Sequence, residues 1–466
     1  MKKRVLIIYL LIILFISISS CTIPNSNNGN NNNQDPNHEC TTFEWVFDEN
    51  VKCLEKAFAN YTCTECGKVS EIAEQVKQHD LVIDKKDATC SEEGHLHQYC
   101  NNCDYSYKTT YPATGKHTFV YEVQRKATKD KYGTKQAICT GCGLTKPYVL
   151  YAANGVADHG KLSVNGPDLV DEHGEKFQLI GLSTHGIQWF HRFVNFDSFD
   201  AIHNEFGINV IRLALTTAEG GYCESDDAGK EFLYNKVVEG ILAATALDMY
   251  VIVDWHMVGA EDPADKNPLT YLKEAKEFFA RISEQFKDYD NVIYEIMNEP
   301  NGNTTWKQCK QYAEAVIPEI RKNTDGIILV GNPKWSADLY SVMNSPLEGY
   351  ENIMYTYHFY ANGGNNPADV VTAYNAGIPV FISEHGGMES SGDGAIDYQK
   401  ISDWYRRLDE KNISYVAWNI SNSKGSASIQ LPSVSDTTDF SNEALKEWGI
   451  WYKAWVRAKF NFPEQK

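Results

Sequence analysis

The sequence predicts an α/β protein in which small cysteine-rich repeat modules precede a (β/α)8 barrel. Two observations carry this prediction. The chain has 12 cysteines, and only Cys223 and Cys309 lie beyond Tyr151, so the first third has a different character from the rest. From there on, short buried-type strands alternate with helical patterns eight times, which is typical of a parallel barrel. An open doubly wound sheet is the alternative.

Composition excludes some classes of partner. The chain has 466 residues, with 43 Lys and Arg against 62 Asp and Glu, and a formal net charge of −19. This charge argues against binding to nucleic acid or to an anionic membrane surface. The 42% hydrophobic content is enough for a sizeable core.

Residues 1–20 have the pattern of an export signal. A basic start, Met1 to Arg4, is followed by the apolar run Val5 to Ile18, which is short for a membrane span. The run ends in Ser-Ser-Cys21, which resembles a bacterial lipoprotein box and implies export, lipidation of Cys21 and anchoring at the cell surface. A plain signal peptide with a chance cysteine is the alternative. Residues 21–37 form an Asn-rich tether that cannot build a core.

Residues 38–150 contain an internal repeat. Cys-x-x-Cys pairs occur three times, the third at Cys139 and Cys142, and His38, His79 and His117 precede them. Two pairs also have a cysteine upstream at the same offset, so three cysteines and a histidine of one repeat are expected to hold a structural zinc ion. The candidate ligands are Cys53, Cys63, Cys66, Cys90, Cys100 and Cys103. The third repeat lacks the upstream cysteine and should be incomplete, and disulfides are the alternative in an exported chain.

Residues 156–462 are expected to form the barrel. Its strands are predicted at 177–183, 210–215, 250–254, 292–297, 327–330, 353–358, 379–383 and 414–418, rich in Val, Ile and aromatic residues. Helical patterns lie between them, for example at 231–247, 270–286, 306–323 and 398–411.

Polar side chains gather at the ends of these strands, where barrel enzymes place their chemistry. Asn298-Glu299-Pro300 ends the fourth strand, and Glu384 ends the seventh. A buried strand that ends in a carboxylate is costly unless the carboxylate is paired or used. One such residue can be an ordinary cap, but two suggest the paired acids of a glycosidase, in which one gives a proton and the other attacks the sugar.

Four segments together resemble glycoside hydrolase family 5, and in particular its bacterial endo-β-1,4-glucanase subfamily. They are Gly181-Leu-Ser-Thr-His-Gly-Ile-Gln-Trp-Phe190, Val251-Ile-Val-Asp-Trp-His256, Ile296-Met-Asn-Glu-Pro300 and Ile382-Ser-Glu-His-Gly386. The resemblance covers about two-thirds of the chain, from His159 to Phe460, and leaves out the repeats. It implies a retaining endoglucanase, EC 3.2.1.4, that acts on cellulose-type β-glucan.

The resemblance also implies roles by position. Glu299 matches the general acid/base and Glu384 the nucleophile, while Asn298 matches the residue that binds the sugar 2-hydroxyl. The remaining expected substrate-binding or supporting residues are His185, Trp189, Arg212, Tyr222, His256, Trp335, His358, Tyr360, Trp418 and Lys424. Lys424 departs from the subfamily pattern, since it comes about one place late in Asn419-Ile-Ser-Asn-Ser-Lys424 and no acid follows it.

No cofactor is implied for catalysis, and the enzyme is expected to be a monomer. Alternative substrates are mixed-linkage glucan, xyloglucan, xylan or mannan. A surface protein that only binds glycans on an inactivated barrel is the alternative of another class, but both acids and their supporting residues are present, which favours an enzyme.

Overall fold

The structure is a computed structural model that describes residues 40–128, 131–259 and 263–462. The chain divides into two compact units, residues 1–116 and 117–466. The signal segment, Cys21, the tether and His38 lie outside the described residues.

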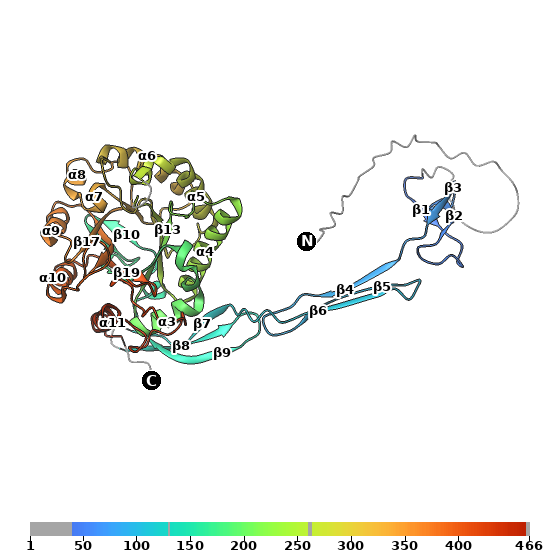
Figure 1. The fold of residues 1–466 in the computed structure, drawn as a ribbon, viewed down its shortest axis with the longest axis horizontal. Coiled ribbons are helices and arrows are strands. Elements are labelled where there is room, and N and C mark those ends of the chain that lie inside the picture. Colours follow the sequence, from blue (N-terminus) through green and yellow to red (C-terminus); the bar gives the residue numbers. More distant parts are fainter. Residues whose placement is uncertain (1–39, 129–130, 260–262, 463–466) are drawn as a thin grey trace. The chain divides into compact units, whose positions relative to one another are not determined.

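Each repeat forms a three-stranded antiparallel sheet (Figure 1). The first contains β1 (Phe43–Val46), β2 (Lys56–Cys63) and β3 (Val69–Val76). The second contains β4 (Leu81–Lys86), β5 (Gly94–Cys100) and β6 (Ser106–Tyr111), and the third β7 (Phe119–Arg125), β8 (Gly133–Cys139) and β9 (Thr145–Tyr151). In each sheet the Cys-x-x-Cys pair begins at the last residue of the middle strand.

Eight parallel strands close into a barrel, as the sequence predicts. They are β12 (Ile180–Thr184), β13 (Val210–Thr216), β14 (Tyr250–His256), β15 (Val292–Glu295), β16 (Ile328–Val330), β17 (Ile353–Tyr360), β18 (Val380–Gly386) and β19 (Tyr415–Ile420). Pairing of β12 with β19 completes the ring. One expectation needs correction: β15 ends at Glu295, so Asn298 and Glu299 follow the strand in irregular backbone.

Helices surround the barrel (Figure 1). The longer ones are α3 (Phe196–Phe206), α4 (Asp227–Ala246), α5 (Leu272–Gln285), α6 (Trp306–Arg321), α9 (Pro367–Asn375), α10 (Tyr398–Asp409) and α11 (Glu447–Lys459). Local sequence explains several starts, because Asp226 and Asp397 cap α4 and α10 and Thr305 forms a capping box with Gln308. Short helices α1 (Val156–His159), α2 (Ile187–Phe190), α7 (Pro333–Ser336) and α8 (Leu339–Asn344) lie in connections.

The barrel interior changes from apolar to charged along its axis. Alternate residues of each strand face inward, and near the amino ends of the strands these include Val210, Tyr250 and Ile293, which share one apolar cluster. Two residues further along β13 and β15 come Arg212 and Glu295, both fully buried. The fold therefore gathers charge at the carboxyl ends of the strands.

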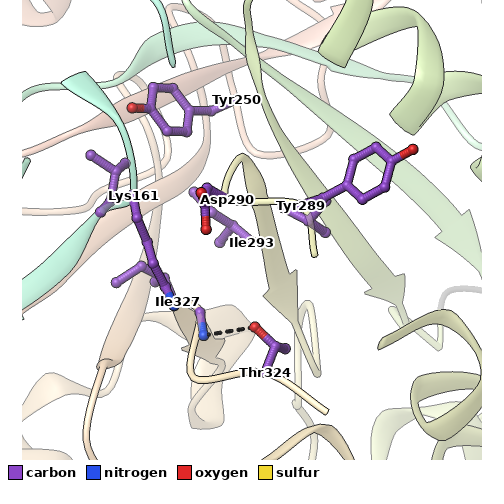
Figure 2. Close-up of a pocket in the computed structure, with 10 residues that line it drawn as sticks. Lys161, Tyr250, Tyr289, Asp290, Ile293, Thr324 and Ile327 are labelled. Atoms are coloured by element: carbon purple, nitrogen blue, oxygen red, sulfur yellow. Dashed lines mark hydrogen bonds between the residues drawn. The ribbon is translucent and has the colours of Figure 1, made fainter. Parts of the chain in front are cut away.

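A small pocket lies at the amino end of the barrel. Figure 2 shows it between Lys161, Tyr250 and Ile327, beside the loop where the Gly326 N–H donates to Thr324 Oγ1. The hairpin of β10 (Ser163–Asn165) and β11 (Asp168–Val170) belongs to the same end of the barrel, since Leu169 joins the apolar cluster there. The opposite end of the barrel, where the buried charges of Arg212 and Glu295 lie, is the better candidate for a site.

The third repeat belongs to the same compact unit as the barrel. Tyr121 donates to Asp200 of α3 at 2.5 Å, and Lys146 pairs with Asp200 at 3.2 Å. Lys135 is 3% exposed and donates to Leu247 O. Burial lowers the pKa of Lys135 to about 8. Figure 1 shows β7–β9 beside α3. This sheet is thus an integral part of the barrel unit.

Within the described ranges, no helix is both long and apolar enough to cross a membrane.

Candidate active site

Glu384 is held from two sides at the carboxyl end of β18. Tyr360, at the end of β17, donates its hydroxyl to Oε1 of Glu384 at 2.8 Å. Arg212 of β13 donates Nη1 to Oε2 of Glu384 at 3.2 Å. These two hydrogen bonds fix the orientation of the Glu384 carboxylate, as a nucleophile requires.

Glu299 lies opposite, fixed by its own backbone and by one histidine. Its N–H donates to Met257 O at 3.1 Å, which ties this irregular segment to the end of β14. His358 of β17 lies with Nδ1 2.9 Å from Oε1 of Glu299. One carboxylate oxygen of Glu299, one of Glu384 and a ring nitrogen of His358 all lie within 4.8 Å of one another. The two acids can therefore reach the same bond of a substrate.

His358 lies between two buried carboxylates, those of Glu299 and Glu295. Burial opposes its charge, but the carboxylates of Glu299 and of Glu295, which lies 3.7 Å from Nε2, outweigh burial and raise the pKa of His358 to about 9. The ring is then cationic at neutral pH and donates both N–H groups, one to Glu299 and one to Ser383 Oγ at 2.9 Å. Ser383 in turn donates to Glu295 at 2.6 Å.

Arg212 anchors the floor of the site. Its Nε donates to Glu295 at 2.7 Å, its Nη2 lies 3.0 Å from Asp254, and Nη2 also donates to Asn298 Oδ1 at 2.6 Å. Burial would raise the pKa of Glu295, but the Arg212 charge dominates and lowers it to about 2. Burial raises the pKa of Asp254 well above its ordinary value, although Arg212 opposes the rise. The charges of Arg212 and Glu295 are thus in place before any substrate arrives.

Neutral rings line part of the same site. His256 stacks on Trp418 with centroids 5.1 Å apart and ring planes within 4°. Burial lowers the pKa of His256 to about 4, and burial together with His256 lowers that of His185 to about 4. Neutral imidazoles beside an indole face suit a sugar ring, which offers apolar faces and hydroxyl edges.

These residues line an open hollow of about 650 Å³. Of the residues expected from the sequence, the lining includes His185, Trp189, His256, Glu299, Tyr360, Glu384 and Trp418. Trp189 is 49% exposed, so about half of its surface is open to solvent. Arg212, Asn298 and His358 lie beneath and support this surface.

Trp335 lies beyond the hollow, in α7, on an unusual backbone. Lys334, Trp335 and Ser336 have φ of 61°, 57° and 54°, a left-handed conformation that costs L-residues about 1–2 kcal/mol each. Hydrogen bonds hold the run, since the Trp335 N–H donates to Pro300 O at 3.1 Å and Ser336 Oγ to Asn298 O at 2.5 Å. They tie this 53% exposed indole to the segment that carries Glu299.

Like Trp335, two further expected contacts, Tyr222 and Lys424, are not among the residues that line the hollow. Tyr222 packs edge-on against Trp255 and Phe278, with centroids 5.7 and 5.5 Å away. Lys424 is exposed, and its carbonyl, with those of Ser423 and Gly425, accepts a hydrogen bond from Lys446 Nζ. The lysine that organises this loop is therefore Lys446, which sequence reasoning missed.

Sequence reasoning also missed Glu295 and Ser383. Both lie inside apolar strands, and a carboxylate in such a run has to be paired. That signal was available in the sequence, whereas the partners of the carboxylate were not.

The cysteines cluster differently from the expected grouping. Cys63 and Cys66 gather with Cys40, while Cys53 gathers with His79, Cys100 and Cys103 of the next repeat. In the third repeat, Cys142 Sγ lies 3.4 Å from His117 Nδ1. The expectation that Cys53 shares a site with Cys63 and Cys66, and Cys90 with Cys100 and Cys103, is wrong. These Cys/His clusters are the candidate metal-binding residues of the described N-terminal region.

Two carboxylates facing one hollow at the carboxyl end of a (β/α)8 barrel define a glycoside hydrolase. Comparison with known families agrees: residues 170–424 match the cellulase family, glycosyl hydrolase family 5. The chain therefore belongs to glycosyl hydrolase family 5.

Individual relatives narrow the class. Endoglucanase A of Butyrivibrio fibrisolvens is 43% identical over 299 residues, which cover 63% of this chain and 68% of the relative. An endoglucanase of Clostridium saccharobutylicum is 41% identical over 283 residues, covering 60% and 61% of the two chains. The catalytic domain of Thermobifida fusca endoglucanase Cel5A superposes with a TM-score of 0.60 at 35% identity, over 65% of this chain and 99% of that domain. The prediction of an endoglucanase-type hydrolase is confirmed.

Proposed function

We propose that the protein hydrolyses internal β-1,4 bonds of cellulose-type glucans with retention of anomeric configuration. The observation that supports this most strongly is the separation of the two acids, since oxygens of Glu299 and Glu384 lie within 4.8 Å. Carboxyl groups of retaining glycosidases stand about 5–5.5 Å apart, whereas those of inverting enzymes stand about 6.5–9.5 Å apart to leave room for water. A solved variant of Thermobifida fusca Cel5A contains cellotetraose, which favours a β-1,4-glucan substrate.

In the first step, Glu384 attacks the anomeric carbon and forms a covalent glycosyl ester. The bond to the departing sugar breaks, and Glu299 gives its proton to the leaving oxygen. Tyr360 and Arg212 hold the attacking carboxylate, and Asn298, fixed by Arg212, is positioned to contact the sugar 2-hydroxyl.

In the second step, Glu299, now ionised, takes a proton from water, and the water oxygen attacks the anomeric carbon. The ester to Glu384 breaks, which restores both carboxyl groups. His358 donates to Oε1 of Glu299, so Oε2 is the oxygen left to exchange the proton. General acid–base help of this kind contributes about 10²–10⁴-fold.

The experiment that tests this proposal is proton NMR of a cello-oligosaccharide digest during the first turnovers. A retaining enzyme releases the β-anomer first, and mutarotation follows later. Initial release of the α-anomer would contradict the proposal. Hydrolysis of a panel of cellulose derivative, mixed-linkage glucan, xyloglucan, xylan and mannan then ranks the substrates.

We also propose that the chain is an exported lipoprotein held at the cell surface through Cys21, because the Ser-Ser-Cys21 motif follows a basic and an apolar segment. Mass spectrometry of the mature N-terminus should find acyl chains on Cys21, and Cys21→Ala should release the protein from membranes. An unmodified mature N-terminus elsewhere would contradict this proposal.

Finally, we propose that the N-terminal Cys/His clusters hold structural zinc.

A further inference from the structure

Three thiols and one imidazole converge in the part of the chain described from residue 40 to 116. Cys53, His79, Cys100 and Cys103 each place one ligand atom within 4.8 Å of the others. Cys53 Sγ lies 3.5 Å from Cys100 Sγ, and Cys103 Sγ lies 3.3 Å from His79 Nδ1. The N–H of Asn102 donates to Cys100 Sγ at 3.3 Å, which favours a thiolate at that position.

The spacing of these atoms suits zinc. Tetrahedral zinc, with Zn–S near 2.3 Å and Zn–N near 2.0–2.1 Å, sets its ligand atoms about 3.5–3.8 Å apart. A disulfide would join two sulfurs at about 2.05 Å and leave the third thiol and the histidine without a role. Three cysteines and one histidine are a common ligand set of structural zinc.

The four ligands come from two different repeats. His79 precedes β4, Cys100 ends β5 and Cys103 lies in the β5–β6 connection, so these three belong to the second sheet. Cys53 lies in the β1–β2 connection of the first sheet. Between Cys53 and its own Cys-x-x-Cys pair runs the eight-residue strand β2, which spans about 25 Å. Cys53 is therefore at the wrong end of its sheet to serve Cys63 and Cys66.

Cys90 is in the same position within the second repeat. The strand β5, with seven residues, separates it from Cys100 and spans about 23 Å. We propose that one zinc ion, bound by Cys53, His79, Cys100 and Cys103, joins the first repeat to the second. This rests on the proposed structural zinc and adds which residues bind it and what it connects.

The first two sheets need such a metal link because they have little hydrophobic core. In the described residues 40–116, the buried hydrophobic residues are only Ala59, Cys63 and Cys100, while Phe58 and Ile72 are 73% and 64% exposed. Sheets with so little core need a metal or covalent staple to stay folded. A ligand borrowed from the neighbouring repeat couples the order of both sheets to one ion.

The test uses the full chain with the other two Cys-x-x-Cys pairs removed, by Cys63→Ser, Cys66→Ser, Cys139→Ser and Cys142→Ser. The protein is purified reduced, stripped of zinc and titrated with Co²⁺, whose visible spectrum reports tetrahedral thiolate ligation. One Co²⁺ per chain is expected. Adding Cys53→Ser should weaken binding by at least about 100-fold, since even outer-sphere changes cost about 10–100-fold. Adding Cys90→Ser is the matched control and should leave binding unchanged.

Loss of binding with Cys90→Ser but not with Cys53→Ser would overturn the proposal in favour of sites within single repeats. Absence of metal together with oxidised thiols in the unaltered chain would overturn it in favour of disulfides. If the fourfold variant binds no Co²⁺, the test moves to the chain with only Cys139→Ser and Cys142→Ser. Adding Cys90→Ser to that chain must leave the number of bound Co²⁺ ions unchanged. Glucan hydrolysis by each variant is read separately, so failure of the zinc proposal and failure of the proposed activity are distinguishable.

Discussion

His358→Gln should remove a pH-dependent part of the stability of the barrel. The His358 ring is 3% exposed and lies between Glu299 and the Ser383–Glu295 pair. Glutamine keeps a polar side chain of similar length but has no charge to gain or lose. The variant therefore isolates the contribution of the protonated imidazole.

The size of the effect follows from the pKa. Folding raises the pKa of His358 from its ordinary 6.5 to about 9, and one pKa unit corresponds to about 1.4 kcal/mol. The charged ring thus contributes about 3 kcal/mol. Because the folded pKa is the higher one, this stability is fully present below pH 6.5 and is lost as the pH rises through 9.

Urea unfolding of both proteins at about pH 6.5 and about pH 9.5 measures this contribution. Burial lowers the pKa of Lys135 to about 8, so Lys135 titrates over part of the same pH range. Its titration makes the folded protein more stable as the pH rises. Its contribution is the same in both proteins and cancels in their difference. The stability gap between wild type and His358→Gln should narrow by about 3 kcal/mol on going to the higher pH.

His385→Gln is the matched control. Burial lowers the pKa of His385 to about 3, so this ring stays neutral across the whole range in the folded protein. The difference in unfolding free energy between His385→Gln and wild type should change by no more than about 0.4 kcal/mol between pH 6.5 and 9.5, because only the unfolded ring titrates near pH 6.5. A gap for His358→Gln that is the same at both pH values would refute the charged-histidine account.

Three further predictions concern the site and the third repeat. Tyr360→Phe removes a hydrogen bond to a charged oxygen, worth about 1.5–3 kcal/mol, and should lower kcat/KM by about 10–150-fold without changing the melting temperature by more than a few degrees; unchanged kinetics would contradict its role. Arg212→Met leaves Asp254, Glu295 and Glu384 without their shared cation and should lower the free energy of unfolding in urea by about 3–5 kcal/mol. Arg281→Met breaks an exposed pair with Glu231 and should lower it by less than about 1 kcal/mol. Equal losses would argue against the buried network. A chain that begins at residue 117 should keep the melting temperature of the barrel. Removal of 38–149 should leave activity measurable but lower that temperature, because the Tyr121–Asp200 hydrogen bond alone is worth about 1.5–3 kcal/mol. Equal melting temperatures of the two truncated chains would show that the third sheet does not stabilise the barrel.

Much of the barrel was predictable because its signals are local. Each strand is a short buried run, and polar residues follow where the run meets the rim. Glu299 and Glu384 could be singled out because a carboxylate at the end of such a run needs a use. The irregular backbone that carries Glu299 could not be predicted, since it depends on hydrogen bonds to the end of β14.

Other features depend on partners that are distant in the sequence. Tyr222 lies in a connection, and nothing local decides whether its ring faces the hollow or Trp255. Lys135 is buried only because the third sheet packs on α3 and α4, which its own repeat does not reveal. The grouping of Cys53 was open to reasoning from the sequence, because a strand between two ligands sets them far apart.

The central claim is the division of roles between Glu384 and Glu299, and azide rescue tests it most directly. Glu299→Ala is given an aryl β-cellobioside whose leaving group needs no proton, so Glu384 can still form the glycosyl ester. Added azide should then attack this ester and give the β-glycosyl azide. In Glu384→Ala, azide should replace the missing nucleophile and give the α-glycosyl azide. Products of the opposite configuration, or two variants that keep near wild-type activity without azide, would contradict the account.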